Sequence, residues 1–341
     1  MQKNITATDV AKYLGMSQST VSRVFTPGAN VSEETRRKVL QAAGELGYHP
    51  NALARSLITK RSNMIGIVMG DILNPFYPDV LSKFSKELSK KGYHVLFVNA
   101  ENEKLRRDEV SHFMEYNVEG AVVTDASMPS SVASYLKENH IPIVMFNRYH
   151  HNSLFHAVSC DNIDGGYQIG KYLIEKGHRQ FAFISGTHNT STSKDREKGF
   201  RKALVESGYN LITDDGDYTY EGAYAAALRL LNSIHPPDAI FCANDIMALG
   251  VIDAAKKLGR QVPEDVSIVG FDDISLAEWS AYSLTTWKQP VNEMIEVTIE
   301  LLLHDIEQKE RNITPQYKTI KGVLVERNSV AERTKRITNE T

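Results

Sequence analysis

The first fifty residues carry helix start and stop signals at a spacing that allows only short helices. Thr6-Ala7-Thr8-Asp9 has the Thr-x-x-Asp pattern of a capping box and predicts a helix that Gly15 ends. Ser17 can cap a second helix, and a third helix is expected from Glu33 to Leu46. Two helices joined by a short glycine turn and followed by a third predict a helix-turn-helix domain over residues 1–50.

The second of these helices is polar over most of its surface. The octet Ser17-Gln18-Ser19-Thr20-Val21-Ser22-Arg23-Val24 leaves only Val21 and Val24 to face a core. Base edges in the major groove of DNA accept hydrogen bonds from Gln, Ser and Arg, while Thr and backbone N–H groups hold phosphates. We therefore interpret this helix as a DNA-reading element. The alternative is an ordinary exposed surface helix.

Charge is distributed unevenly along the chain. The first 61 residues hold nine Lys or Arg and four Asp or Glu, a formal net charge of +5, whereas the whole chain of 341 residues carries −3. A basic N-terminal part on an acidic body is expected when only that part approaches phosphate groups.

Residues 51–62 connect the basic part to the rest of the chain. Asn51 to Ile58 could form two helical turns, but a helix this short is marginal in water without a partner. The segment is therefore expected to be a hinge whose folding is conditional. A plain linker whose leucines pack on the body is the alternative.

From Met64 onward, short apolar runs alternate with amphipathic stretches, which predicts parallel sheets covered by helices. The pattern restarts after residue 160, so we expect two similar lobes: residues 63–160 with 290–328, and residues 161–289. Residues 323–328 are a candidate crossing between the lobes, and residues 329–341 are expected to be a polar tail. The expected strands are 64–69, 95–98, 121–124, 143–146, 181–185, 239–242 and 267–269, and the expected helices are 79–91, 106–116, 131–138, 167–176, 196–207, 220–231 and 245–258.

Several motifs recur in a fixed order along the chain. They include Ser17-x-x-Thr20-Val21-Ser22-Arg23-Val24, Gly47-Tyr48-x-Pro50-Asn51, Asn74-Pro75-Phe76-Tyr77, Asn244-Asp245 and Gly270-Phe271-Asp272-Asp273. With these motifs, over about residues 6 to 328, the chain resembles the lactose-repressor/galactose-repressor family of bacterial transcription regulators. The resemblance implies an α/β fold with an N-terminal helix-turn-helix DNA-binding domain and a two-lobed core like that of periplasmic binding proteins, made of two parallel-sheet, Rossmann-like subdomains. In such a core the chain crosses between lobes three times, here near Cys160-Asp161, near Trp287 to Gln289 and after Ile320.

The resemblance also implies a homodimer that binds a palindromic, double-stranded operator and represses transcription. Its hinge would fold on DNA and place Leu57 in the minor groove, where an apolar wedge between base steps bends the duplex. The residues expected to contact DNA are Thr6, Ser17, Gln18, Ser19, Thr20, Ser22, Arg23, Asn30, Asn51, Ala54, Arg55 and Leu57.

A small effector is expected in the cleft between the lobes, because ligands bind at the carboxyl ends of parallel strands. From the residues at those ends we expect this effector to be a sugar or sugar derivative. Asp272 and Asn244 each follow an expected strand, and Arg196 is expected to open a helix. Carboxylate, amide and guanidinium groups suit sugar hydroxyls, and aromatic faces suit the sugar ring. A purely structural pair is the alternative for Arg196 and Asp272, and Asp245 is interpreted as a helix cap. The resemblance also places Arg196, Asn244 and Asp272 at effector positions of the family, and Asn147 is added by resemblance alone. The candidate effector-binding residues are Phe76, Tyr77, Asn147, Arg196, Tyr218, Asn244, Asp272 and Trp287.

The sequence offers little support for other chemistry. Gly165-Gly166-x-x-x-Gly170 does not have the dinucleotide-binding spacing, and close helix packing by small residues explains it better. With no recognisable nucleophile motif or phosphate loop, we predict no enzyme activity, no catalytic residues and no cofactor. The competing hypothesis is a cytoplasmic sugar-binding protein or an enzyme of sugar metabolism without operator binding.

Cysteine and histidine usage favours an intracellular protein without metal. Cys160 and Cys242 lie in apolar, strand-like stretches and are expected to be buried free thiols. His150, His151 and His156 match no zinc pattern and are expected in a solvated loop. Without a leader or an apolar run of about 18 residues, we expect a cytoplasmic location and no membrane span.

Overall fold

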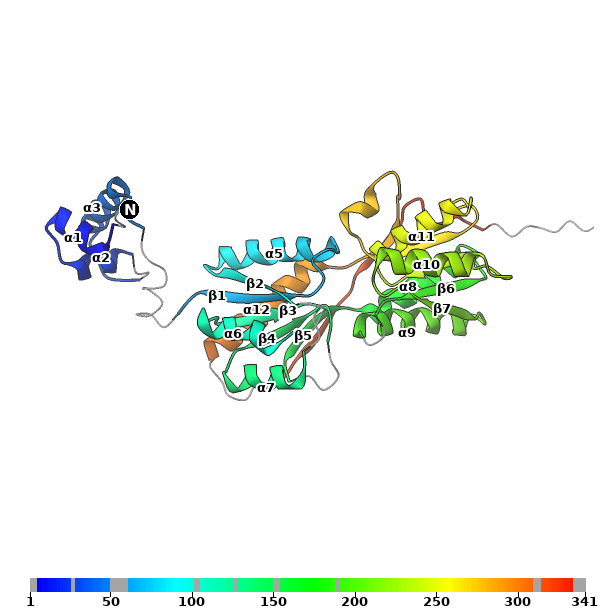
Figure 1. Cartoon of the computed structure of the whole chain (residues 1–341), viewed down its shortest axis with the longest axis horizontal. Helices are drawn as coiled ribbons and strands as arrows, with labels where there is room; N and C mark the ends of the chain where they lie inside the picture. The colour runs from blue at the N-terminus through cyan, green and yellow to red at the C-terminus, as the bar shows by residue number, and fades with distance from the viewer. Residues whose placement is uncertain are drawn as a thin grey trace, which may run out of the picture. The chain divides into compact units, whose positions relative to one another are not determined.

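The computed structural model describes residues 5–25, 28–49, 61–100, 105–125, 128–149, 154–187, 190–308 and 314–333. The chain divides into two compact units, Met1–Ser62 and Asn63–Thr341. Figure 1 shows helices α1, α2 and α3 in the first unit and the two α/β lobes of the second.

The first unit has the predicted helix-turn-helix layout. Its described residues form α1 (Ala7–Leu14), α2 (Gln18–Val24) and α3 (Glu33–Leu46). The capping box is formed, because the Asp9 N–H donates to Thr6 Oγ1 at 3.3 Å and the Thr6 N–H donates to the Asp9 carboxylate at 2.9 Å. Gly15 ends α1 in the left-handed region at φ +62°, as the glycine turn requires. The buried core residues are Val10, Ala11, Val21, Val24, Val39 and Ala42.

The first lobe is built on a fully parallel six-stranded sheet in the order β11-β5-β4-β3-β1-β2. Alternate residues of β1 face opposite sides: Ile65 and Ile67 belong to one apolar cluster with α5 and α12, whereas Val68 belongs to another with α6 and α7. The strands are β1 (Met64–Met69), β2 (His94–Asn99), β3 (Gly120–Val123), β4 (Ile143–Phe146), β5 (His156–Cys160) and β11 (Tyr317–Ile320), and the helices are α5 (Phe76–Lys90), α6 (Arg107–Glu115), α7 (Ser130–Glu138) and α12 (Val291–Gln308).

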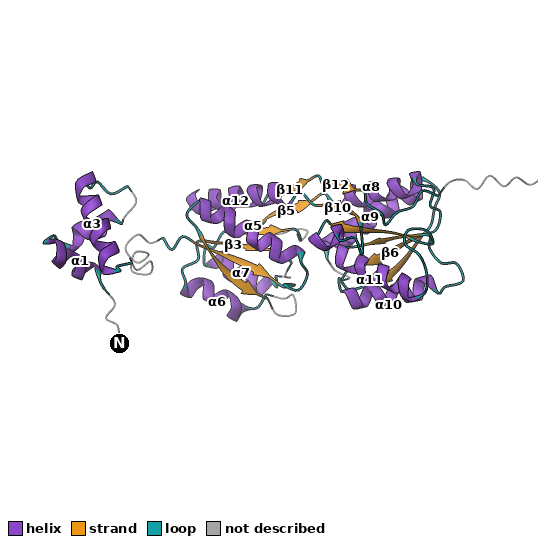
Figure 2. Cartoon of the chain, turned by 90° about the horizontal axis from the view of Figure 1, so that it is seen from above, coloured by secondary structure: helices purple, strands orange, loops and turns teal. Residues whose placement is uncertain are grey.

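The second lobe has a six-stranded sheet in the order β12-β10-β9-β8-β6-β7, in which only β12 runs antiparallel to its neighbour. Figure 2 shows both sheets lying between layers of helices. The strands are β6 (Phe181–Ser185), β7 (Leu211–Asp215), β8 (Ala239–Cys242), β9 (Ser267–Asp272), β10 (Thr285–Lys288) and β12 (Val323–Val325), and the helices are α8 (Asn162–Glu175), α9 (Ser191–Glu206), α10 (Tyr220–Leu231), α11 (Asp245–Lys257) and the short 3-10 turn η2 (Ser275–Glu278).

The chain crosses between lobes at the three expected places: between β5 and α8, between β10 and α12, and between β11 and β12. The last crossing assigns residues 323–328 to the second lobe. The polar tail also begins later than expected. Ser329 is 1% exposed, and its hydroxyl donates to the Ile268 carbonyl at 2.6 Å while accepting the Thr285 N–H. Residues 329–333 are therefore part of the lobe, because their polar groups complete the hydrogen bonding of its strands.

Helices α8 and α9 approach each other closely at glycines. A Cβ on Gly166 would lie 2.1 Å from the Arg196 carbonyl oxygen, and a Cβ on Gly199 would lie 2.0 Å from the Ile163 carbonyl oxygen. The helix-packing interpretation of the glycine motif is confirmed.

Gly199→Ala is accordingly expected to push α8 and α9 apart and to lower the free energy of unfolding by about 2 to 3 kcal/mol. Urea denaturation followed by circular dichroism would measure the loss. Gly44→Ala on α3, where nothing lies within 4 Å of the added Cβ, is the matched control and should not destabilise the core. Equal stability of Gly199→Ala and the wild type would contradict the close-packing argument.

Candidate functional site

Polar and aromatic side chains from both lobes converge where the carboxyl ends of their strands meet. From the first lobe, Phe76 and Tyr77 begin α5 just after β1, and Asn147 follows β4. From the second lobe, Asp272 ends β9 and Asn244 follows β8. This is the edge at which parallel sheets place their ligands.

Arg196 is an almost fully enclosed cation in this region, with 2% of its surface exposed. Its Nε donates to Asn162 Oδ1 at 2.8 Å, its Nη1 donates to the Ala243 carbonyl, and its Nη2 lies 3.5 Å from Asp272 Oδ1. The guanidinium carbon lies 3.6 Å from the centre of the Phe271 ring. We expected Arg196 to open its helix, and this prediction was wrong. Helix α9 begins at Ser191, so Arg196 lies in its second turn.

Asp272 combines burial with an unusual backbone. It is 8% exposed and has φ +122°, a region that favours glycine and costs a non-glycine residue conformational energy. Burial raises the pKa of Asp272 to about 6, against the opposing effects of Arg196 and of Gln289, whose Nε2 donates to Asp272 Oδ1 at 2.7 Å. Strain of this kind clusters at ligand sites, which agrees with the role predicted for Asp272.

Asn244, and not Asp245 as we expected, caps the helix that follows β8. Asn244 is the helix cap, because its Oδ1 accepts the Met247 N–H at 3.0 Å. Asp245, predicted to be the cap, is fully buried and accepts hydrogen bonds from Thr286 Oγ1 at 2.5 Å and the Ile274 N–H at 2.9 Å. The prediction for Asp245 was wrong because its side chain turns toward the neighbouring strands instead of its own helix.

The two buried carboxyls predict a measurable pH dependence of stability. Burial raises the pKa of Asp245 to about 7, with a further contribution from Asp272, whose own pKa is raised to about 6; the ordinary value is 3.8. The folded chain thus holds these protons more tightly than the unfolded chain, so their stabilising effect is present below the unfolded pKa and is lost as the pH rises through 6 and 7.

Asp245→Asn should therefore reduce the fall in unfolding free energy between about pH 5 and pH 7.5. Urea denaturation at a series of pH values would measure it. Asp253→Asn on the same helix is the control, because its carboxylate is half-buried and accepts hydrogen bonds from Tyr220 and Tyr282. If the Asp245→Asn profile kept the wild-type slope, the assignment of the titration would be wrong.

The first lobe contributes a second set of buried polar groups. The Tyr77 hydroxyl accepts from Asn147 Nδ2 at 3.3 Å, and burial raises the pKa of Tyr77, with Asp125 adding to the effect. Asn147 is 4% exposed at φ +69°, and its Oδ1 has no hydrogen-bond partner among the described residues. Asp125 is fully buried and accepts the N–H groups of Gly70 and Asp71, each at 2.7 Å.

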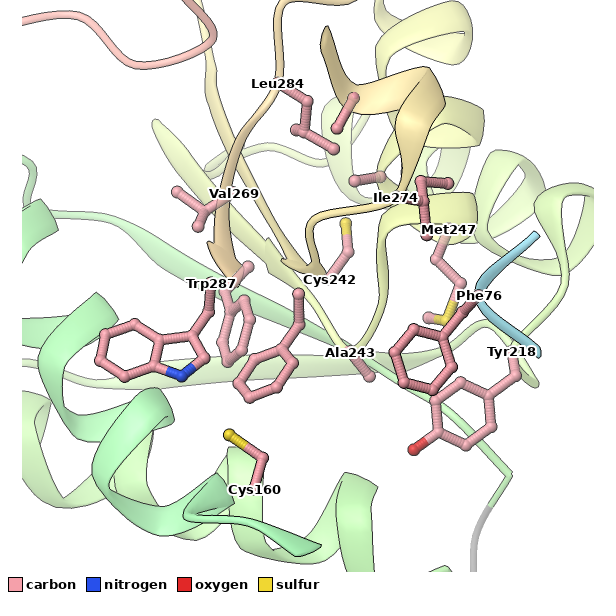
Figure 3. Close-up of a cluster of buried hydrophobic side chains, with 14 of the residues drawn as sticks. Phe76, Cys160, Tyr218, Cys242, Ala243, Met247, Val269, Ile274, Leu284 and Trp287 are labelled. Atoms are coloured by element: carbon pink, nitrogen blue, oxygen red, sulfur yellow. The ribbon is translucent and has the colours of Figure 1, made fainter. Parts of the chain in front are cut away.

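Tyr218 brings the two sets together. Figure 3 shows its ring beside Phe76, which comes from the other lobe. The Tyr218 hydroxyl lies 2.7 Å from Thr192 Oγ1, and the Arg148 guanidinium carbon lies 5.3 Å from the ring centre. A Cβ on Gly186 would lie 2.3 Å from the ring, so that glycine makes room for it.

The helix predicted to read DNA presents the expected polar face. Gln18, Ser19 and Arg23 are exposed, whereas Val21 and Val24 are buried. Ser17 caps α2 by accepting the Thr20 N–H, while Ser22 is half-buried and Asn30 is exposed. Thr6 is engaged in the capping box of α1. The hinge residues Asn51, Ala54, Arg55 and Leu57 lie outside the described residues.

Comparison with known proteins decides the family. Residues 6–51 match the model of bacterial regulatory proteins of the lacI family, and residues 171–330 match that of the periplasmic binding protein-like domain. The HTH-type transcriptional repressor PurR of Klebsiella pneumoniae is 35% identical over 333 residues, which cover 96% of this chain and 97% of PurR. The chain belongs to the lacI family. As a lacI-family member it is a DNA-binding transcriptional repressor and not an enzyme.

Solved structures of the lacI family confirm the predicted fold class. The lac repressor dimer bound to operator and the anti-inducer ONPF superimposes with a TM-score of 0.85 at 25% identity, covering 96% of this chain and 100% of that one. The complex of the transcriptional regulator CelR with cellobiose gives a TM-score of 0.70 at 29% identity, covering 95% and 99%.

Among the aromatic candidates of this lacI-family chain, Trp287 stands apart. Figure 3 shows Trp287 and Tyr218 at opposite ends of the buried cluster, with Cys160 below it. The indole ring centre lies 6.4 Å from that of Phe271, and Trp287 is 4% exposed. Phe76, Tyr77 and Tyr218 thus lie together where the two lobes meet. Trp287 lies at the other end of the buried cluster, beside the crossing from β10 to α12 (Figure 3).

Sequence reasoning missed several polar neighbours of these residues. Asn162, Thr192 and Gln289 contact Arg196, Tyr218 and Asp272, and Asp125 and Arg148 come from the first lobe. No local pattern marks them; the only available sign was their position next to expected strand ends or lobe crossings.

The cysteine prediction for this lacI-family chain is confirmed, because Cys160 and Cys242 are buried free thiols. His156 does not lie in a solvated loop. It is 3% exposed at the start of β5, accepts the Gln316 N–H at its Nδ1, and lies 3.1 Å from Asp305. His150 and His151 lie outside the described residues. Among the residues that are described, no group of three metal-binding side chains occurs and no helix is long and apolar enough to span a membrane.

Proposed function

We propose that this repressor acts in the cytoplasm as a homodimer on a palindromic operator, and that a sugar or sugar derivative bound between its lobes sets its affinity for DNA. The observation that carries the effector site is the convergence of buried polar side chains from both lobes. Arg196 and Asp272 come from the second lobe, and Tyr77 and Asn147 come from the first.

The hydrogen-bonding capacity of these groups favours a polyhydroxy ligand. Within the described residues, Asn147 Oδ1 and Gln289 Oε1 are buried acceptors without a partner. A buried acceptor left unsatisfied is costly, so a ligand with several donors is favoured there. Sugar hydroxyls both donate and accept, and the rings of Phe76 and Tyr218 offer apolar faces. The CelR complex with cellobiose supports this class of ligand.

The coupling to DNA follows from the topology. Because site residues come from both lobes, an effector stabilises one arrangement of the lobes over another. In a dimer, such a rearrangement changes the spacing of the two segments that precede β1, and so the free energy of folding them on DNA. The lac repressor dimer bound to operator supports the dimeric arrangement. A coupling free energy of about 1 to 3 kcal/mol would give a useful switch.

Two measurements test the proposal. Genomic fragments retained by the full-length protein would identify its operator, and affinity for that fragment should fall steeply as salt rises, since several phosphate contacts release counterions. Calorimetry of the full-length protein against cellobiose, other sugars, sugar phosphates and nucleobases would then identify the effector class. Failure to retain any fragment contradicts operator binding, and heat with nucleobases alone contradicts the sugar assignment. Repeating the DNA titration with the bound compound shows whether it releases or promotes binding.

A further inference from the structure

The segment that follows β4 reaches across to the second lobe. Asn147 contacts Tyr77 within the first lobe, whereas the next residue, Arg148, places its guanidinium over the ring of Tyr218. Arg148 is also fixed to its own lobe, because its Nη1 donates to the Asp125 carbonyl at 2.5 Å. Asn147 thus bonds within its own lobe, whereas Arg148 contacts both lobes.

Tyr149 makes the strongest of these contacts between lobes. Its N–H donates to Ser191 Oγ at 3.0 Å, and its hydroxyl donates to Asp195 Oδ2 at 2.7 Å. Ser191 and Asp195 lie one turn apart on α9, so a single tyrosine holds two points of the same helix. A hydrogen bond to a carboxylate is among the stronger ones that proteins make.

The ring of Tyr149 is anchored on the first lobe. Its centre lies 4.4 Å from that of Tyr317 on β11, and the Tyr317 hydroxyl lies 3.0 Å from Ser159 Oγ on β5. Burial, together with the Asp195 carboxylate, raises the pKa of Tyr149, so its hydroxyl keeps its proton and remains a donor at neutral pH. Tyr149 is thus braced by one lobe while its polar groups bind the other.

Helix α9 connects this contact to the candidate site. Asp195 immediately precedes Arg196, whose guanidinium binds Asn162, Ala243 and Asp272. The hydrogen bonds of Tyr149 use none of those groups. The strength of lobe closure and the chemistry of the site can therefore vary separately in this chain.

We propose that Tyr149, Ser191 and Asp195 form a latch that holds the two lobes closed without using any effector-contacting group, and so sets how readily the cleft opens. If the proposed function holds, the latch also sets the apparent affinity for the effector, because a ligand held by both lobes binds only the closed fraction. Strengthening or weakening this one contact would shift the response without altering ligand choice.

The test measures the distance between lobes in the full-length protein. Nitroxide labels on Lys137→Cys in α7 and Lys202→Cys in α9, both exposed positions, report that distance by pulsed electron paramagnetic resonance. The two native thiols are buried, and dilution with unlabelled protein restricts the signal to distances within one chain. In the background of this pair, Tyr149→Phe should raise the ratio of open to closed molecules by about tenfold, because it removes the hydrogen bond to Asp195 that crosses between the lobes.

Tyr317→Phe is the matched control. It removes a hydroxyl from the same ring pair, but that hydroxyl bonds within the first lobe, so the distance distribution should stay as in the wild type. Ser191→Ala should open the lobes by about threefold through the other hydrogen bond, and it keeps the idea testable if Tyr149→Phe folds poorly. An unchanged distribution in both Tyr149→Phe and Ser191→Ala would overturn the latch, as would equal opening in Tyr149→Phe and Tyr317→Phe. The measurement involves neither operator nor effector, so its result stands whether or not the proposed function fails.

Discussion

Replacing Arg196 by methionine is expected to lower the free energy of unfolding by about 3 to 5 kcal/mol, because it leaves Asp272 buried without its cation. Asn162 and the Ala243 carbonyl lose their donor in the same step. Calorimetry with whichever sugar the wild type binds should show no heat. Urea denaturation would measure the loss of unfolding free energy.

Two further variants separate the structural role of Arg196 from its role in binding. Arg201→Met, on the same helix but exposed and paired with Glu197 among the described residues, should cost no more than about 1 kcal/mol. Asp272→Asn added to Arg196→Met removes the uncompensated charge and should recover part of the lost stability while binding stays absent. Full sugar binding by Arg196→Met would show that the pair is structural alone.

The ends of the N-terminal helices could be predicted from the sequence because the interactions that fix them are local. Thr6 and Asp9 are three residues apart, as are Ser17 and Thr20, and Gly15 directly follows the last residue of α1. In the body, the buried strands β1, β4, β6 and β8 were predicted with the correct bounds, since a strand covered on both faces is a continuous apolar run.

Strands at the edges of the sheets were missed because they are not covered on both faces and so lack a continuous apolar run. β7 ends in Asp214 and Asp215 and is only half-buried, so its sequence lacks the apolar run. β12 is three residues long and runs antiparallel to β10, which no repeat of the strand-helix pattern indicates. Ser329 is buried only because the chain returns to the second lobe at its third crossing.

The sequence predicted which site residues follow the ends of strands, but it did not predict which partners those residues bond to. Position after a buried strand was enough to single out Asn244 and Asp272. Which of Asn244 and Asp245 caps α11 depends on Thr286 and Ile274, which are distant in the sequence. The roles of Gln289 and Tyr149 depend in the same way on tertiary contacts, and the positive φ of Asp272 has no signature in its residue type.

Arg23→Ala is expected to weaken binding to the selected operator by about ten- to a hundredfold, which corresponds to the loss of one specific base contact. Arg23 is exposed on α2, and its side chain makes no hydrogen bond or ion pair within the part of the chain that the structure describes. Its guanidinium is therefore available to DNA at no cost to the fold. Fluorescence anisotropy at one fixed salt concentration, with the operator and with an unrelated duplex, would measure both affinities.

Lys38→Ala is the charge-matched control for this measurement. It also removes one positive charge from the helix-turn-helix unit, but Lys38 lies on α3 and is already paired with Glu34 at 2.7 Å. Because a base contact distinguishes sequences and a phosphate contact does not, Arg23→Ala should reduce operator affinity far more than affinity for the unrelated duplex. Equal losses on the two duplexes would reassign Arg23 to the phosphate backbone, and an unchanged operator affinity would mean that α2 does not read the DNA.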